Sequence, residues 1–131
     1  NQSYEKYIEN HEQGRAFIKI TTDAWKHKFV NQNLIFPIAY ACSANQEGIS
    51  LEEMLLTYLH SNLCNLLSAG VKLIPLGRTA GQIIQIELNK YIEEEYKGIL
   101  KKDLNDIGNC GWVNDIVSMK HENQFTRIFR T

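Results

Sequence analysis

Cysteine and histidine side chains are the groups in this chain best suited to bind a metal ion or to begin nucleophilic chemistry. The three cysteines are widely spaced and form no C-x-x-C pair, which argues against a zinc ribbon or a disulfide framework and favours a reducing compartment. The four histidines form neither an H-x-x-x-H nor an H-E-x-x-H pair, and lone histidines are more often surface or hydrogen-bonded residues than ligands. This leaves Cys110 and His121 as candidate ligands for a soft metal such as Ni²⁺.

A glycine-containing segment at residues 73–82 is similar to a phosphate-binding turn before a helix. Its spacing differs from that of a P-loop, and no Lys-Ser or Lys-Thr pair follows the second glycine. Two glycines also allow two helices to pack closely, and we favour this structural role over nucleotide binding. The residues concerned are Pro75, Leu76, Gly77, Arg78, Gly81 and Gln82.

The chain contains no recognisable catalytic nucleophile. It has no G-x-S-x-G elbow, and neither its serines nor its cysteines lie in a known local signature. The acidic run at residues 93–95 is predicted to lie on a solvated helix face, where a general acid–base pair is improbable. We therefore expect no enzymatic activity.

Composition excludes several classes of protein. The 131 residues suit one domain, predicted to span residues 1–131, and 44% hydrophobic with 22% charged residues is ordinary for a globular chain. A net charge of −1 argues against nucleic-acid binding, and the longest apolar run is too short to span a membrane. The first residue is Asn, from which we expect that the natural chain is longer.

Hydrophobic periodicity predicts an all-α helical bundle. Ser50 and Glu53 form a capping box before a leucine-rich stripe, which we expect to be a central helix covered by several others. Pro37 suits the first turn of a short buried helix. Further helices are predicted over residues 4–24, after a break at Pro75 through Ile83 to Leu100, and from Trp112 onward.

The C-terminal segment, residues 112–131, carries an unusual concentration of large apolar groups beside an arginine and a His-Glu pair. Exposed aromatic residues with an arginine are typical of interface hot spots. The alternative is that the segment folds back on its own bundle, and the residues do not decide between the two. The members concerned are His121, Glu122, Phe125, Arg127, Ile128 and Phe129.

Two of these segments resemble one known family. Residues 71–82, V-K-L-I-P-L-G-R-T-A-G-Q, are similar to the V-x-x-(V/I)-P-L-G-Q-x-x-G-Q segment of the urease accessory protein UreF family. Residues 119–129 resemble the M-x-H-E-x-x-x-x-R-(L/I)-F ending of that family. Arg78 departs from the pattern, because the family usually has Gln there. Members are longer, so the chain resembles their C-terminal part and lacks their N-terminal helices.

The resemblance implies an all-α, non-catalytic, cytoplasmic protein that forms homodimers and joins UreD (also called UreH), the GTPase UreG and apo-urease. Such a protein bridges UreD to UreG and modulates GTP hydrolysis while the complex handles nickel, with no stably bound cofactor. By this resemblance the C-terminal segment would contact the UreD-type partner, and the 73–82 turn would be a structural turn or a GTPase contact. Two alternatives remain open: a generic helical interaction domain, and a metal-binding chaperone that uses Cys110 and His121.

Overall fold

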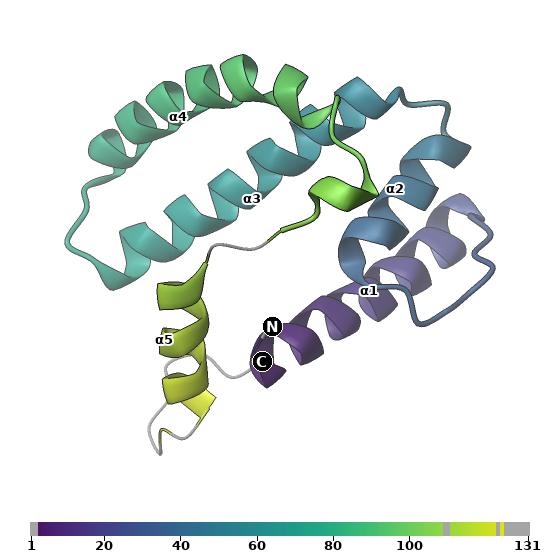
Figure 1. The fold of residues 1–131 in the computed structure, drawn as a ribbon, viewed down its shortest axis with the longest axis horizontal. Coiled ribbons are helices and arrows are strands. Elements are labelled where there is room, and N and C mark those ends of the chain that lie inside the picture. The colour runs from purple at the N-terminus through teal and green to yellow at the C-terminus, as the bar shows by residue number, and fades with distance from the viewer. Residues whose placement is uncertain (1–2, 109–110, 123, 125–131) are drawn as a thin grey trace. The chain divides into compact units, whose positions relative to one another are not determined.

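The computed structural model describes residues 3–108, 111–122 and 124, and in this part of the chain helix is the sole regular structure (Figure 1). This confirms the all-α prediction. The helices are α1 (Tyr4–Trp25), α2 (Phe36–Gln46), α3 (Leu51–Leu73), α4 (Arg78–Ile99), the short 3-10 helix η1 (Leu104–Asp106) and α5 (Trp112–Glu122). Among the described residues no helix combines the length and apolarity that a membrane crossing requires.

The helices group into two compact units. The first unit comprises residues 1–48 and 107–131, in which α1 packs against both α2 and α5. The second unit, residues 49–106, consists of α3 and α4 packed side by side with η1 after them. That the whole chain forms one domain stays a prediction.

The first unit is organised around the contact between α1 and α2. The ring of Phe17 lies 5.5 Å from that of Phe36, edge to face, and 5.9 Å from that of Tyr40. The buried apolar side chains among the described residues are small or branched, namely Ile18, Ala39 and Ala44. Pro37 lies in the first turn of α2, as predicted, where its missing N–H costs no hydrogen bond.

Helix α1 ends in a left-handed residue. Lys26 has φ 62°, and the N–H of His27 donates to the carbonyl of Thr21 at 3.3 Å. The Lys26 N–H donates to the same carbonyl in a six-to-one hydrogen bond, and the two donors satisfy one of the carbonyls that a helix leaves free at its C-terminus. The chain is thereby turned back so that His27 meets α2.

In the second unit, the predicted capping box is present at the start of α3. The Ser50 hydroxyl accepts from the Glu53 N–H at 3.2 Å, and the Glu53 carboxylate accepts from the Ser50 N–H at 3.1 Å. The expectation that several helices cover α3 is wrong for the described residues, because none of its side chains is buried and Leu66 is 73% exposed. The leucine stripe is wider than the surface that α4 alone can cover.

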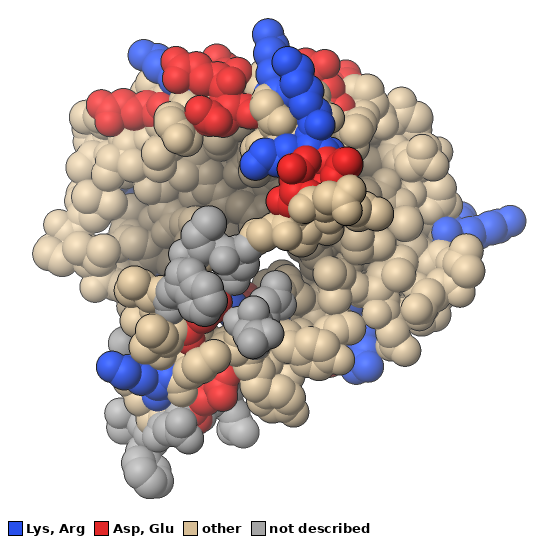
Figure 2. All heavy atoms as spheres, in the orientation of Figure 1, with Lys and Arg blue, Asp and Glu red and all other residues tan. Residues whose placement is uncertain are grey.

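Acidic and basic side chains gather along the outer face of α4, as Figure 2 shows. Glu93, Glu94, Glu95 and Lys97 are all exposed there. This agrees with the prediction of a solvated face for the 93–95 run.

Replacing Ser50 with alanine is expected to destabilise the second unit by about 1 kcal/mol, because the N–H of Glu53 loses its acceptor. Hydrogen bonds from the side chain and then the backbone of Ser50 lower the pKa of the Glu53 carboxyl. The ionised Glu53 carboxylate therefore stabilises the folded state fully above the pKa that glutamate has in the unfolded chain. This stabilisation is lost as the pH falls through the lower pKa of Glu53 in the folded state. The difference in melting temperature between the parent and Ser50→Ala should therefore become smaller in acid. A difference that does not change with pH would contradict the capping role of the Ser50–Glu53 pair.

Candidate functional site

Helix α5 lies along the first turns of α1, and polar residues hold the two together. His121 Nδ1 lies 2.8 Å from Glu5 Oε2, and the Glu5 N–H donates to Glu122 Oε1 at 3.3 Å. Nearer the start of α5, the hydroxyls of Ser3 and Ser118 are 2.6 Å apart. His121 and Glu122 therefore help to hold α5 on α1, and their predicted contact with a partner stays a prediction.

An ion pair reinforces this contact. Lys6 Nζ lies 2.6 Å from Asp115 Oδ1, and the Asp115 side chain is only 10% exposed against 28% for Lys6. A partly buried, charge-assisted hydrogen bond of this kind is stronger than an exposed pair. The sequence did not indicate it, because the two residues are 109 positions apart.

Replacing Asp115 with alanine is expected to weaken the docking of α5 on α1 by about 1–3 kcal/mol, because the Lys6 ammonium loses its carboxylate at a partly buried position. Limited trypsin digestion, followed by mass spectrometry, should show faster cleavage after Lys120 in this variant. The matched control is Glu12→Ala, which removes an exposed ion pair with Arg15 and should leave the rate nearly unchanged. Equal cleavage rates for the two variants would show that the Lys6–Asp115 pair does not hold α5.

Other sides of α5 carry exposed apolar residues. Asp115, Ser118 and Glu122 recur at three- and four-residue spacing and face α1. Met119 follows Asp115 by four residues and so lies near that side, whereas Val113, Ile116 and Val117 lie away from it. The exposed apolar residues are Val113 at 77%, Ile116 at 52%, Val117 at 58% and Met119 at 45%. Val113, Ile116 and Val117 share their side of the helix with the exposed Lys120, and exposed apolar residues grouped in this way are typical of a protein interaction site.

The remaining predicted interface residues cannot be placed. Phe125, Arg127, Ile128 and Phe129 lie outside the described residues, and so does the candidate ligand Cys110. His121 is described, and its Nδ1 atom faces Glu5. In the ranges that the structure does describe, no group of three or more His, Cys, Asp or Glu side chains is arranged to hold a metal ion.

The 73–82 turn joins α3 to α4 and brings part of the predicted set to one cavity. Gly77 precedes α4 as its N-cap residue, Pro75 is exposed and Leu76 is half-buried. A Cβ on the buried Gly81 would lie 3.2 Å from Val71 Cγ2, so this glycine allows close packing of the two helices. A Cβ on Gly77 would meet no atom within 4 Å, so the predicted packing role applies to Gly81 alone.

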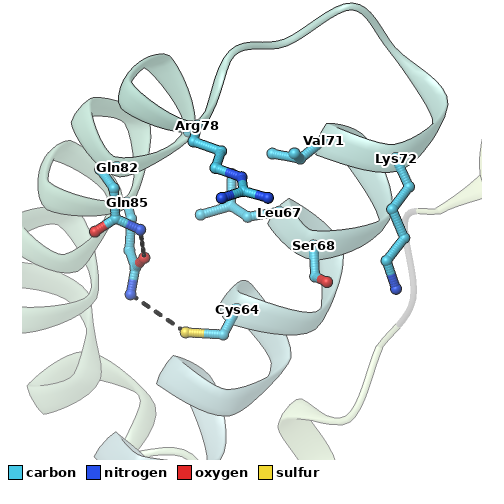
Figure 3. A pocket seen from close by; sticks show the side chains of 9 residues that line it. Cys64, Leu67, Ser68, Val71, Lys72, Arg78, Gln82 and Gln85 are labelled. Atoms are coloured by element: carbon cyan, nitrogen blue, oxygen red, sulfur yellow. Dashed lines mark hydrogen bonds between the residues drawn. The ribbon is translucent and has the colours of Figure 1, made fainter.

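The cavity lies between α3 and α4 and has a volume of about 550 Å³ (Figure 3). Lys72 and Arg78 are the two charged side chains in its lining. Pro75, Leu76 and Gly77 do not line it. The complete lining is Cys64, Leu67, Ser68, Val71, Lys72, Arg78, Gly81, Gln82 and Gln85.

A serine, a histidine and a glutamate form a hydrogen-bonded chain that the sequence did not reveal. Ser43 Oγ lies 2.6 Å from His27 Nδ1, and His27 Nε2 lies 2.6 Å from Glu47 Oε1. These are the residue types of a hydrolase triad. However, Ser43 and His27 are each only 7% exposed, so a substrate carbonyl has no approach to the hydroxyl. The chain of hydrogen bonds instead fixes the segment after α1 to α2.

The described residues thus define an all-helical protein in which the polar side chains hold helices together and one helix presents an apolar face to solvent. Comparison with known proteins then identifies the family to which this all-helical protein belongs. The model of the UreF family matches residues 2–89, and the chain belongs to the UreF family of urease accessory proteins.

The curated relatives cover nearly the whole chain. It is 33% identical to the urease accessory protein UreF of Bradyrhizobium sp. (strain ORS 278) over 98% of this chain and 56% of that protein. The UreF of Granulibacter bethesdensis is 36% identical over 98% of this chain and 58% of its own length. The UreF of Synechocystis sp. is 43% identical over 73% of this chain. The chain therefore spans little more than half the length of the relatives that it matches along its whole extent.

Proposed function

We propose that this protein is a non-catalytic scaffold in urease maturation that bridges a UreD/UreH-type protein and the GTPase UreG on apo-urease. Membership of the UreF family supports a role as an accessory protein, and the exposed apolar face of α5 supports a role in protein interaction. In this proposal the protein acts in the cytoplasm as a homodimer and modulates GTP hydrolysis during nickel insertion. It binds no cofactor stably, and nickel is handled by the complex.

The exposed face of α5 is the observation that carries the proposal. A helix whose apolar side chains are 45–77% exposed gains free energy when a partner covers them, at roughly 25 cal/mol per Å² of apolar surface. The polar contacts of α5 with α1 hold the helix in place, so the partner need not order it on binding. Phe125, Arg127, Ile128 and Phe129, which the sequence analysis assigns to the partner contact, follow shortly after α5 in sequence.

Replacing Val117 with aspartate is expected to weaken binding of the UreD/UreH-type partner at least tenfold, because a charge would then face an apolar surface (a factor of ten is about 1.4 kcal/mol). Biolayer interferometry with the immobilised partner measures this directly. Val30→Asp provides the matched control, since Val30 is fully exposed in the segment between α1 and α2. Both variants should keep the parent melting temperature; equal affinities for the two would move the interface away from α5.

Of the two alternatives left open by the sequence, the first is excluded. The family match shows that the resemblance to UreF is not a coincidence in an unrelated helical domain. The metal-binding chaperone that uses Cys110 and His121 stays a hypothesis, because Cys110 lies outside the described residues.

A further inference from the structure

A histidine and a cysteine stand one helical turn apart on α3 with their reactive atoms adjacent. His60 Nε2 lies 3.4 Å from Cys64 Sγ. Residues at positions i and i+4 share one face of a helix, so the spacing itself produces this approach. This H-x-x-x-C pair is not among the candidate ligands that the sequence indicated.

We infer that His60 and Cys64 form an exchangeable binding site for a late first-row divalent transition-metal ion. An imidazole nitrogen and a thiolate sulfur are borderline and soft ligands, which suit Ni²⁺, Co²⁺ or Zn²⁺ and disfavour Mg²⁺ and Ca²⁺. This inference is independent of the proposed scaffold function, because it rests on other residues and needs no partner.

The distance between the two ligand atoms matches what one metal ion requires. Metal–nitrogen bonds of about 2.0–2.1 Å and metal–sulfur bonds of about 2.3 Å separate the two atoms by roughly 3.6 Å in a tetrahedral site. Square-planar geometry with the same bond lengths brings them to roughly 3.1 Å. The observed 3.4 Å lies between these values, so an ion can be bound with only small side-chain adjustments.

A neighbouring residue on α4 prepares the histidine to act as a ligand. His60 Nδ1 lies 3.0 Å from Asn89 Oδ1, and an amide oxygen can only accept a hydrogen bond, so Nδ1 carries the proton. Nε2 then accepts from the Cys64 S–H, and its lone pair becomes available to a metal ion when the thiol loses its proton. Metal-binding histidines usually donate their second ring N–H to such an acceptor, which fixes the tautomer and the ring orientation.

The sulfur is also accessible and supported. Gln85 donates a hydrogen bond from Nε2 to Cys64 Sγ at 3.3 Å, and Cys64 lines the cavity between α3 and α4 (Figure 3). His60 is exposed. An ion can therefore reach both ligands from solvent, and water would fill the remaining positions. Two protein ligands make a site that exchanges its metal, in contrast to the four ligands of a structural zinc site.

Binding at this site exchanges one proton for one ion. The S–H bond of Cys64 breaks, a metal–sulfur bond forms, and the proton passes to solvent. No oxidation or reduction is involved. Proton release in weakly buffered solution is consequently a second readout, independent of absorbance.

The test titrates the full-length, reduced protein with Ni²⁺ and, separately, Co²⁺, and follows the near-ultraviolet charge-transfer band that a metal-bound thiolate produces. We expect the band at one equivalent per chain, its loss in Cys64→Ser, and binding at least tenfold weaker in His60→Gln. Asn89→Ala should weaken binding about tenfold while both ligands remain. Circular dichroism shows whether each variant is folded.

Matched controls separate this site from the other thiols. Cys42→Ser and Cys110→Ser should retain the band, since Cys42 lies exposed on α2 and Cys110 belongs to the other candidate pair. Three results would overturn the inference: a band that persists in Cys64→Ser, a band that is lost in Cys110→Ser, or no band in the parent protein at about tenfold excess of metal.

Discussion

Replacing Gly14 with alanine is expected to destabilise the first unit by at least about 3 kcal/mol. A Cβ at this position would lie 2.0 Å from the carbonyl oxygen of Leu34 and 3.0 Å from backbone atoms of Ile35 and Phe36. No flexible side chain can move aside there, because all three obstacles are backbone. The chain leading into α2 would have to separate from α1, and the packing of Phe17 against Phe36 would be lost with it.

Helix propensity alone predicts the opposite sign for this substitution. Alanine is about 1 kcal/mol better than glycine inside a helix, and Gly14 lies in the middle of α1. Gly70→Ala is the matched control, because a Cβ there meets no atom within 4 Å and the residue is also helical. Urea denaturation should show Gly70→Ala to be neutral or stabilising. If Gly14→Ala proved as stable as the parent, the close approach of α1 to the 34–36 segment would be wrong.

Replacing His27 with alanine is expected to cost about 2–4 kcal/mol. The substitution removes two hydrogen bonds of 2.6 Å, leaves the buried Ser43 hydroxyl without the imidazole, and creates a cavity in the core of the first unit. It also releases the segment that follows the left-handed residue Lys26. The free energy of unfolding, measured in denaturant, gives the size of the effect.

A second histidine substitution provides the comparison for His27. His60 is exposed, so His60→Ala in metal-free buffer should change the free energy of unfolding by no more than about 0.5 kcal/mol. Similar losses for the two variants would contradict the structural role given to the Ser43–His27–Glu47 chain.

Local signals in the sequence were sufficient to place the helices. Two examples are the capping box at Ser50 and Glu53 and the proline at position 37 in the first turn of α2. Each signal involves residues within one helical turn, so it can be recognised in the sequence without knowledge of the fold. The prediction that several helices cover α3 was wrong. An apolar stripe shows that a helix face is suited to packing, but it does not show whether helices of the same chain cover that face.

Contacts between distant segments could not be predicted in this way. Lys6 and Asp115 pair across 109 positions, and His27 reaches Ser43 only because α1 ends in a left-handed residue. The effect of a substitution at Gly14 likewise depends on the approach of a backbone segment about twenty positions later. Such pairings follow from the fold and leave no pattern in a single sequence.

The residues of the candidate interface stay predictions. His121 and Glu122 are predicted as partner contacts, and the structure adds that both form hydrogen bonds with Glu5 of α1. The apolar pattern of α5 was recognised as helical, but which side faces solvent required the contacts of Asp115 and Ser118. Arg127 and its neighbours remain predictions, since they lie beyond the described residues.

The central proposal is that this UreF family member is a scaffold, and size-exclusion chromatography with light scattering tests it most directly. The natural full-length protein would be run alone and then with the UreD/UreH-type and UreG-type proteins of the same organism. The account predicts a dimer alone, a single complex that contains all three proteins without added metal, and loss of that complex when residues 124–131 are deleted. A folded, monodisperse protein that binds neither partner would contradict the scaffold proposal and leave the family relationship without a bridging role.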